Sequence, residues 1–243
     1  MSFTQQPSTY KLLQCLYNMA DMQNTLRTFK FDTCVDGCTP FFKDTVLVHQ
    51  CISCNKPRWK SCKNTCVDGE GDKICRHPAT PVRSVYYMPV EDRLRKLLRS
   101  DIRNLFKYPV YRHKSSGDGL VQDFFDSTTY LDFNAIAPDD GEMIYLQVCW
   151  DGADMFNHAG KSMWPLCYSI LNLPPSLRDK VHVGMHVASF DDGSDAATEL
   201  FAHELLHLWE TGFIVDGRKY YACCPQVVMD GRGREKFCKV QVK

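Results

Sequence analysis

The chain contains 243 residues, of which 29 are basic and 29 acidic, so its formal net charge is zero. This length accommodates a small module beside one larger domain, and the balanced charge does not by itself indicate a nucleic-acid-binding protein. Residues 1–6 contain neither a basic nor an apolar stretch, so no secretory signal is expected, and no apolar run is long enough to cross a bilayer. With no route to an oxidising compartment, the 13 cysteines are expected to bind metal rather than to form disulfides.

Residues 1–27 carry a weak helical pattern, and residues 28–80 are predicted to form a zinc-binding module. Two pairs of closely spaced cysteines lie in this module: Cys34, Cys38, Cys51 and Cys54. Four thiolates are typical ligands of tetrahedral Zn²⁺, and sites of this kind fold only with their metal. Residues 41–48 are predicted to form the hairpin that joins the two pairs in a zinc ribbon. The alternative is four buried free thiols.

A second group of potential ligands follows directly after the first. Its members are Cys62, Cys66, Cys75 and His77. The spacing of this group is less typical of zinc sites, because one residue alone separates its last two members. A second metal site and a loop with free side chains are equally compatible with it.

Residues 81–133 are predicted to form a linker that contains an amphipathic basic helix at 90–107. The basic side chains of the helix are Arg93, Arg95, Lys96, Arg99 and Arg103, and Arg58 and Lys60 follow the second cysteine pair. Basic groups at this density suit contacts with nucleic-acid phosphates. The alternative is a solvated helix face that pairs with Glu91, Asp92 and Asp101.

Residues 134–243 are predicted to form an α/β core with a mixed sheet. The expected elements are strands at 142–151, 163–173 and 180–190, a helix at 196–211 and a strand at 220–229. The first run is apolar on both sides, which is typical of a central strand, and Gly212 follows the helix where a C-terminal cap belongs. Three antiparallel strands followed by a right-handed helical crossover place the fourth strand beside the first and parallel to it.

Two carboxylates follow the strands that this topology makes neighbours. Asp151 follows the first strand and Asp230 follows the fourth, and neighbouring strands lie about 4.8 Å apart. Two carboxylates at that distance repel each other unless a divalent cation neutralises them, and oxygen ligands favour Mg²⁺ or Mn²⁺. We therefore expect a ribonuclease-H-like fold with a catalytic metal site; the alternative is that both residues form Asp-Gly turns.

The sequence resembles the transposases of CACTA-type (En/Spm) DNA transposons over roughly residues 28–230. The resemblance rests on the two cysteine pairs, on Pro57-Arg-Trp-Lys60, Tyr86-Tyr-Met-Pro89, Asp151-Gly152, Trp164-Pro165, Asn172-Leu-Pro-Pro175, and on Glu204-Leu205 with Leu208-Trp209 and Gly212. It implies a cut-and-paste transposase that acts on transposon ends in the nucleus, with Asp151 and Asp230 as catalytic acids and with no membrane partner. The sequence departs from the family in two ways. Pro225 is awkward in a central strand, and the third acid, which the family carries on a later helix, is absent. The core is therefore expected to be incomplete at its C-terminus and the chain to be inactive alone, in need of a C-terminal portion or of oligomerisation.

The helix at 196–211 contains His203-Glu-Leu-Leu-His207, which matches the zinc-protease motif. Helical spacing places both histidines on the solvent side, away from the apolar stripe, and no third ligand is evident. Glu204 projects near the apolar stripe, where a carboxylate is costly unless it is paired or bound to metal, and we expect it to be a third acidic ligand. A non-catalytic zinc module that binds nucleic acid or protein is the main alternative function, and a zinc protease is the second.

Overall fold

The computed structural model describes residues 27–61, 66–67, 73–74, 79–112, 121–150, 164–178, 185–189 and 195–229. The predicted N-terminal helical pattern lies outside these ranges, as do Asp151 and Asp230. Most of the second cysteine group, Cys62, Cys75 and His77, also lies outside them, and of Cys66 the backbone alone is described.

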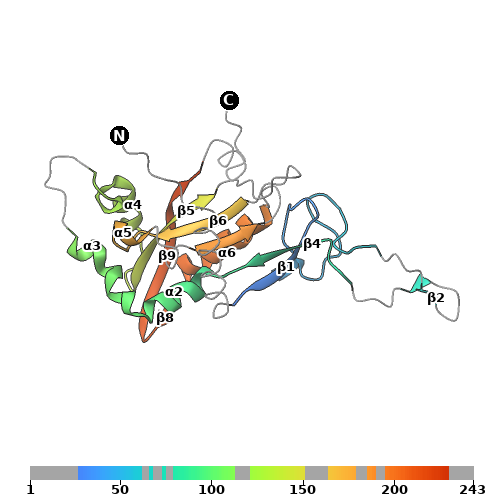
Figure 1. The fold of residues 1–243 in the computed structure, drawn as a ribbon, viewed down its shortest axis with the longest axis horizontal. Helices are drawn as coiled ribbons and strands as arrows, with labels where there is room; N and C mark the ends of the chain where they lie inside the picture. The colour runs from blue at the N-terminus through green and yellow to red at the C-terminus, as the bar shows by residue number, and fades with distance from the viewer. Residues whose placement is uncertain are drawn as a thin grey trace, which may run out of the picture.

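A five-stranded mixed sheet forms the centre of the core domain (Figure 1). Its strands are β5 (Glu142–Trp150), β6 (Trp164–Ile170), β7 (Met185–Ser189), β8 (Phe213–Val215) and β9 (Arg218–Val228), in the order β7-β6-β5-β9-β8. β5, β6 and β7 form an antiparallel meander, and α6 (Asp195–Glu210) leads back to β9, which runs parallel to β5. The predicted meander, the crossover and the adjacency of the first and fourth strands are therefore confirmed.

The pairing of β5 with β9 contains one irregularity. Tyr145 pairs with Cys223, but the next described pair is Gln147 with Gln226, so β9 carries one extra residue there. Pro225 lies inside this irregularity, and proline cannot donate a hydrogen bond to a sheet. A β-bulge lets β9 keep its pairing on both sides of the proline.

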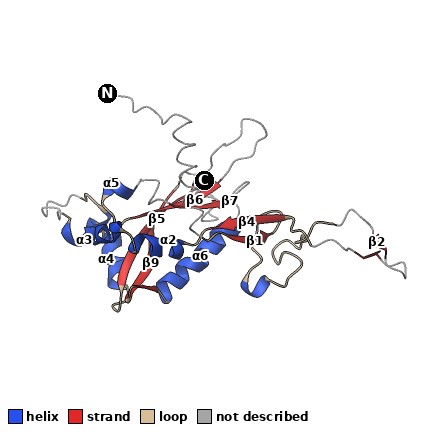
Figure 2. Cartoon of the chain, turned by 60° about the horizontal axis from the view of Figure 1, so that its bottom comes forward, coloured by secondary structure: helices blue, strands red, loops and turns tan. Residues whose placement is uncertain are grey.

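The two faces of the sheet bury different side chains. Ile144, Leu146, Val148 and Trp150 of β5 lie in the main hydrophobic core with residues of α6 and α2 (Val90–Leu98). Figure 2 shows α2 and α6 together on this side of the sheet. The opposite face carries Tyr145, Gln147 and Cys149, and is called the glutamine face below.

Aromatic residues cover one end of the glutamine face. Tyr145 packs there against Phe124 and Phe125, which belong to the short helix η3 (Phe124–Asp126). The helices α3 (Tyr108–Tyr111), α4 (Thr128–Ala135) and α5 (Pro175–Arg178) gather at the same end of the molecule (Figure 1).

The helix predicted at 90–107 is broken into two parts. α2 ends at Leu98, and a 3-10 helix, η2 (Asp101–Lys107), follows. Ser100 between them has extended backbone angles, and its hydroxyl donates to the carbonyl of Leu97. Serine competes with helical hydrogen bonds in this way, which accounts for the break.

A smaller two-stranded sheet carries the cysteine module at the other end of the molecule (Figure 1). β1 (Phe29–Thr33) pairs antiparallel with β4 (Arg83–Tyr87), and β4 lies beside β7 and α6. A further short antiparallel pair consists of β2 (Cys66–Val67) and β3 (Lys73–Ile74). Within the described ranges, no helix combines the length and the apolar character that crossing a membrane requires.

Replacing Gly212 with alanine is expected to lower the free energy of unfolding by more than about 1 kcal/mol. Gly212 ends α6 at φ 68°, and a Cβ there would lie 2.5 Å from the carbonyl oxygen of Tyr220. Gly217 is a matched control, because its φ is 75° but a Cβ would meet nothing within 4 Å. Urea denaturation of both variants checks the prediction, and equal losses would show that the close approach to Tyr220 is unimportant.

Candidate metal centre

Four cysteine sulfurs converge in the module built on β1 and β4. The Sγ atoms of Cys34, Cys38, Cys51 and Cys54 all lie within 4.8 Å of one another, and those of Cys34 and Cys54 are 3.3 Å apart. A tetrahedral ion with Zn–S bonds of about 2.3 Å needs sulfurs about 3.8 Å apart, so this cluster can hold such an ion with small adjustments. The predicted convergence of the two cysteine pairs is confirmed.

Each cysteine pair lies on a tight turn, and the two turns are built alike. In the first, the N–H of Cys34 donates to the carbonyl of Thr39 and Gly37 has φ 72°. In the second, the N–H of Cys51 donates to the carbonyl of Lys56 and Asn55 has φ 60°. Glycine and asparagine are the residues that tolerate positive φ best. These turns bring two short sequence motifs, 13 residues apart at Cys38 and Cys51, to one point.

The cluster is electrostatically suited to a cation. Burial, together with the neighbouring thiols of Cys34 and Cys54, raises the pKa of the Cys38 thiol to about 12. Burial also raises the pKa of Cys51, but hydrogen bonds from Thr39 and from backbone N–H groups outweigh it and lower the value to about 6. The protein thus stabilises one thiolate strongly, whereas four neighbouring thiolates require a bound cation to offset their repulsion.

The segment between the two turns differs from the predicted hairpin. It contains a 3-10 turn, η1 (Lys43–Thr45), in which the hydroxyl of Thr45 donates to the carbonyls of Pro40 and Phe42. Because this local hydrogen bonding replaces the pairing of two strands, the zinc-ribbon hairpin is absent from the described part of the module. The sheet beneath the cysteines is instead β1 with β4, whose strands are about fifty residues apart in the sequence.

The buried side chain of Arg58 links several segments of the module. Its guanidinium pairs with Asp32 at 2.7 Å and donates to the carbonyls of Val46 and Val48. It also lies over the rings of Phe41 and Trp59, at 4.8 and 4.3 Å from their centroids. Arg58 is 8 % exposed, so the prediction that it contacts nucleic-acid phosphates is corrected: its donors are used within the module.

The predicted basic face of the helix is also smaller than the sequence suggests. Arg93 is 1 % exposed and lies inside the main core, so the predicted phosphate contact at this residue is corrected. Arg95 pairs with Glu91 at 2.6 Å, and Arg103 pairs with Asp216 at 3.2 Å. The exposed members of the predicted set are Lys60, Lys96 and Arg99, and Arg99 lies 3.9 Å from Asp216. The paired, solvated helix face is therefore the better description of α2.

The helix with the protease-like motif uses its polar side chains in structural contacts. The ring of His203 packs on Phe42 with a centroid distance of 5.2 Å, and its Nδ1 lies 3.5 Å from Nζ of Lys43. His207 is exposed, as predicted. Among the described residues, the four clustered cysteines form the one group of three or more potential ligands that could hold a metal, and neither histidine belongs to it.

Glu204 lies under the start of α2, where three donors surround its carboxylate. It accepts hydrogen bonds from the hydroxyl of Tyr87 and from the N–H groups of Val90 and Glu91, the latter two at 3.0 Å. Burial raises the pKa of Glu204, against the effect of these hydrogen bonds. An acid at a helix N-terminus is favourably placed, and these contacts account for its burial without a metal ion.

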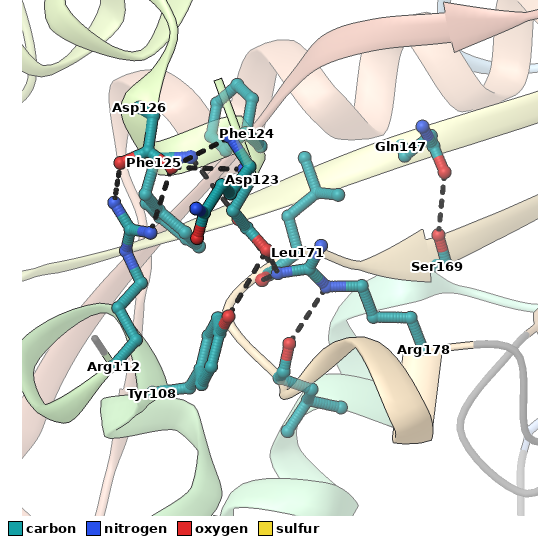
Figure 3. A network of polar contacts seen from close by, with 12 residues as sticks. Tyr108, Arg112, Asp123, Phe124, Phe125, Asp126, Gln147, Ser169, Leu171 and Arg178 are labelled. Carbon is teal, nitrogen blue, oxygen red and sulfur yellow. Dashed lines mark hydrogen bonds and ion pairs between the residues drawn. The ribbon is translucent and has the colours of Figure 1, made fainter. Parts of the chain in front are cut away.

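A cluster of buried arginine–aspartate ion pairs, which the sequence patterns did not indicate, lies beside the glutamine face. Figure 3 shows Arg178 next to Asp123 and Arg112 next to Asp126. Arg178 pairs with Asp123 at 2.9 Å, and it also donates to the carbonyls of Leu171 and Leu173. These charges are largely buried and compensate one another, so they clamp η3 and α5 to the sheet. No short motif identifies such a pair, because its members are about fifty residues apart in the sequence.

An open cavity of about 460 Å³ lies next to this clamp. Its lining includes Gln147, Gln226, Asp123, Arg178, Phe124 and Leu171. Gln147 donates to Gln226 at 3.0 Å, and Ser169 donates to Gln147 at 3.4 Å (Figure 3). The side chains of β6, β5 and β9 thus touch one another across this face.

Comparisons with known proteins give no relative for this chain. No family model matches it, and neither a curated protein nor a solved structure is significantly similar.

Proposed function

We propose that the chain is a DNA-transposase-type protein, with a ribonuclease-H-like core and a structural zinc centre. The observation that carries this proposal is the sheet order β7-β6-β5-β9, in which the parallel neighbours β5 and β9 are connected through α6. This arrangement places the ends of two distant parts of the sequence at the same edge of the sheet.

The catalytic part of the proposal rests on the residues that follow these two strands. The last described pair joins Cys149 of β5 to Val228 of β9. Asp151 and Asp230 each come two residues after their member of this pair in the sequence and lie outside the described residues. Two carboxylates held close together would bind Mg²⁺ or Mn²⁺, and such an ion would activate water and stabilise the leaving oxygen in phosphoryl transfer. DNA is the proposed substrate.

The zinc part of the proposal rests on the four clustered cysteines. Zn²⁺ is the ion that a closed tetrahedral set of four thiolates suits best. No open position remains for substrate in such a set, so the role of the metal is to stabilise the module. Exposed Lys60 follows the second cysteine turn and is one of the basic side chains proposed to contact phosphate.

The chain is expected to bind Mn²⁺ through Asp151 and Asp230, and the Asp151→Asn and Asp230→Asn variants are each expected to weaken this binding tenfold or more. The reason is that each substitution removes one of two charged oxygen ligands from a hard cation. Electron paramagnetic resonance of free Mn²⁺ in a titration measures the effect. Asp132→Asn, which changes an exposed acid on α4, is the control. Equal binding by all three variants and the parent chain would contradict the acidic site.

A non-catalytic metal module is the second candidate function. The cysteine cluster is a complete ligand set, and a protein that binds DNA or another protein through such a module needs no acidic site. Mn²⁺ binding that does not depend on Asp151, together with retained zinc, would favour this candidate over the transposase.

A further inference from the structure

Two further cysteines face each other across the central strands of the sheet. Cys149 of β5 and Cys167 of β6 are register partners in an antiparallel pair. Residues directly opposite each other in such a pair project on the same face, with Cβ atoms about 4.5–5.5 Å apart. Two sulfurs on these carbons can approach one ion together, since Zn–S bonds measure about 2.3 Å.

The neighbouring row of the same face shows that side chains here do meet. Gln147 and Ser169 are the register partners two residues away, and their side chains are hydrogen-bonded at 3.4 Å. Gln147 also bonds to Gln226 on β9, and both glutamines line the open cavity. The two thiols therefore lie one row along from a polar space that solvent and ions can enter.

The environments of the two thiols differ in a way that suits ligation. Cys149 is exposed, whereas Cys167 is half-buried. As register partners, their thiolates would lie side by side, and two negative charges so close are unfavourable without a cation, as in the cysteine cluster of the module. Val148 and Trp150, the neighbours of Cys149 in the sequence, project to the opposite face and are fully buried. They pack in the hydrophobic core, whereas Cys149 does not.

We propose that Cys149 and Cys167 form a second thiolate metal site, separate from the four-cysteine centre and specific for a soft ion such as Zn²⁺ or Cu⁺. Binding of a divalent ion displaces one proton from each thiol, so two protons are released for each ion bound.

This site is independent of the proposed transposase chemistry. Thiolates are soft ligands that select zinc or copper, whereas the proposed acidic site takes Mg²⁺ or Mn²⁺. Failure of one site therefore leaves the other intact, and spectroscopy distinguishes them because carboxylate ligands give no sulfur-to-metal charge transfer.

The test is a Co²⁺ titration of the whole chain under a non-thiol reductant, followed by absorption in the sulfur-to-cobalt charge-transfer region. The Cys149→Ser/Cys167→Ser variant is expected to bind one equivalent fewer than the parent chain. The lost band should be about half as intense per cobalt as that of the four-cysteine centre, since two thiolates replace four.

Two control variants keep the result interpretable. Cys224→Ser removes a cysteine of β9 that donates to the carbonyl of Gln226, and it is expected to keep the full stoichiometry. Cys62→Ser/Cys66→Ser accounts for any cobalt bound by the second cysteine group. The single Cys149→Ser variant, at an exposed position, repeats the measurement if the double variant does not fold. Identical stoichiometry and charge-transfer intensity in the parent chain and in a folded Cys149 variant would overturn the proposal, and so would a Cys149–Cys167 disulfide that persists under the reductant.

Discussion

Cys51→Ser is expected to abolish high-affinity zinc binding and to unfold both cysteine turns of the module. Hydrogen bonds from Thr39 and from backbone N–H groups lower the pKa of Cys51 to about 6 and so stabilise its thiolate. Folding of the module is coupled to metal binding, and structural zinc contributes about 10–16 kcal/mol in small zinc domains. The cysteines and Phe41 form a separate small core, which is too small to hold the turns together without the ion.

Metal analysis and limited proteolysis of the purified variant measure this effect. Cys224→Ser serves as the matched control, because it removes one cysteine from the core sheet and leaves the cluster complete. Cleavage is expected between β1 and β4 in Cys51→Ser but not in the control. A Cys51→Ser protein that retains one tightly bound zinc and an intact module would contradict the assignment of the centre. Chelation of zinc from the parent chain should reproduce the cleavage pattern of the variant.

The order of the core strands could be predicted from the sequence because burial leaves a clear pattern there. β5 is apolar on both sides in the sequence, as is typical of a central strand, and a right-handed crossover through α6 then predicts that β9 lies beside it. The cysteine cluster was predictable for a similar reason, since ligands a few residues apart on a tight turn are close by covalent geometry alone. Both inferences depend on local or strongly restricted geometry.

Other features depend on contacts that sequence patterns describe poorly. Arg58 and Arg93 were grouped with surface charges by residue type, yet both are buried. For Arg93 a signal was available, because it lies three residues after Val90 and four before Leu97, within the apolar stripe of α2. No sequence pattern marks Arg58, since its partner Asp32 lies on β1, 26 residues away in the sequence.

The strand β8 was missed although its turn has a specific signal. Asp216 and Gly217 join β8 to β9, and both have positive φ. Asp-Gly between two short apolar runs is typical of a two-residue hairpin. The same Asp-Gly dipeptide occurs at Asp151 and Asp230, after longer predicted strands. There the prediction was a metal site or a turn, and no hairpin was predicted at Asp216.

The cysteine module is joined to the core through α6. The N–H of Ala196 donates to the carbonyl of Gly37 on the first cysteine turn, and Phe42 packs on His203. Glu204, the residue after His203, accepts hydrogen bonds from Tyr87 of β4 and from the start of α2. These residues of α6 therefore position the module, while Leu208, one turn after Glu204, packs in the main core beneath the sheet. Glu204 is the charged residue at this joint.

Glu204→Ala is expected to lower the free energy of unfolding by about 3–5 kcal/mol. The substitution removes the acceptor of three donors, the hydroxyl of Tyr87 and the N–H groups of Val90 and Glu91. Each buried donor that loses its partner costs about 1–3 kcal/mol. Glu204→Gln keeps one acceptor oxygen and is expected to cost less. Glu210→Ala, at an exposed position on the same helix, is the control, and urea denaturation measures all three.

The pH dependence of stability tests the same contacts in a second way. Because burial raises the pKa of Glu204 above its usual value of 4.5, the folded protein binds more protons than the unfolded chain between that value and the raised pKa. The contribution of Glu204 to stability therefore falls as pH rises through this window, and Glu204→Gln should remove that part of the slope. If Glu204 were a metal ligand, Glu204→Ala and Glu204→Gln would both weaken Mn²⁺ binding by the folded protein. We expect Mn²⁺ binding to stay unchanged in Glu204→Gln, and a tenfold loss there, with stability retained, would assign the residue to the acidic site instead of to the joint.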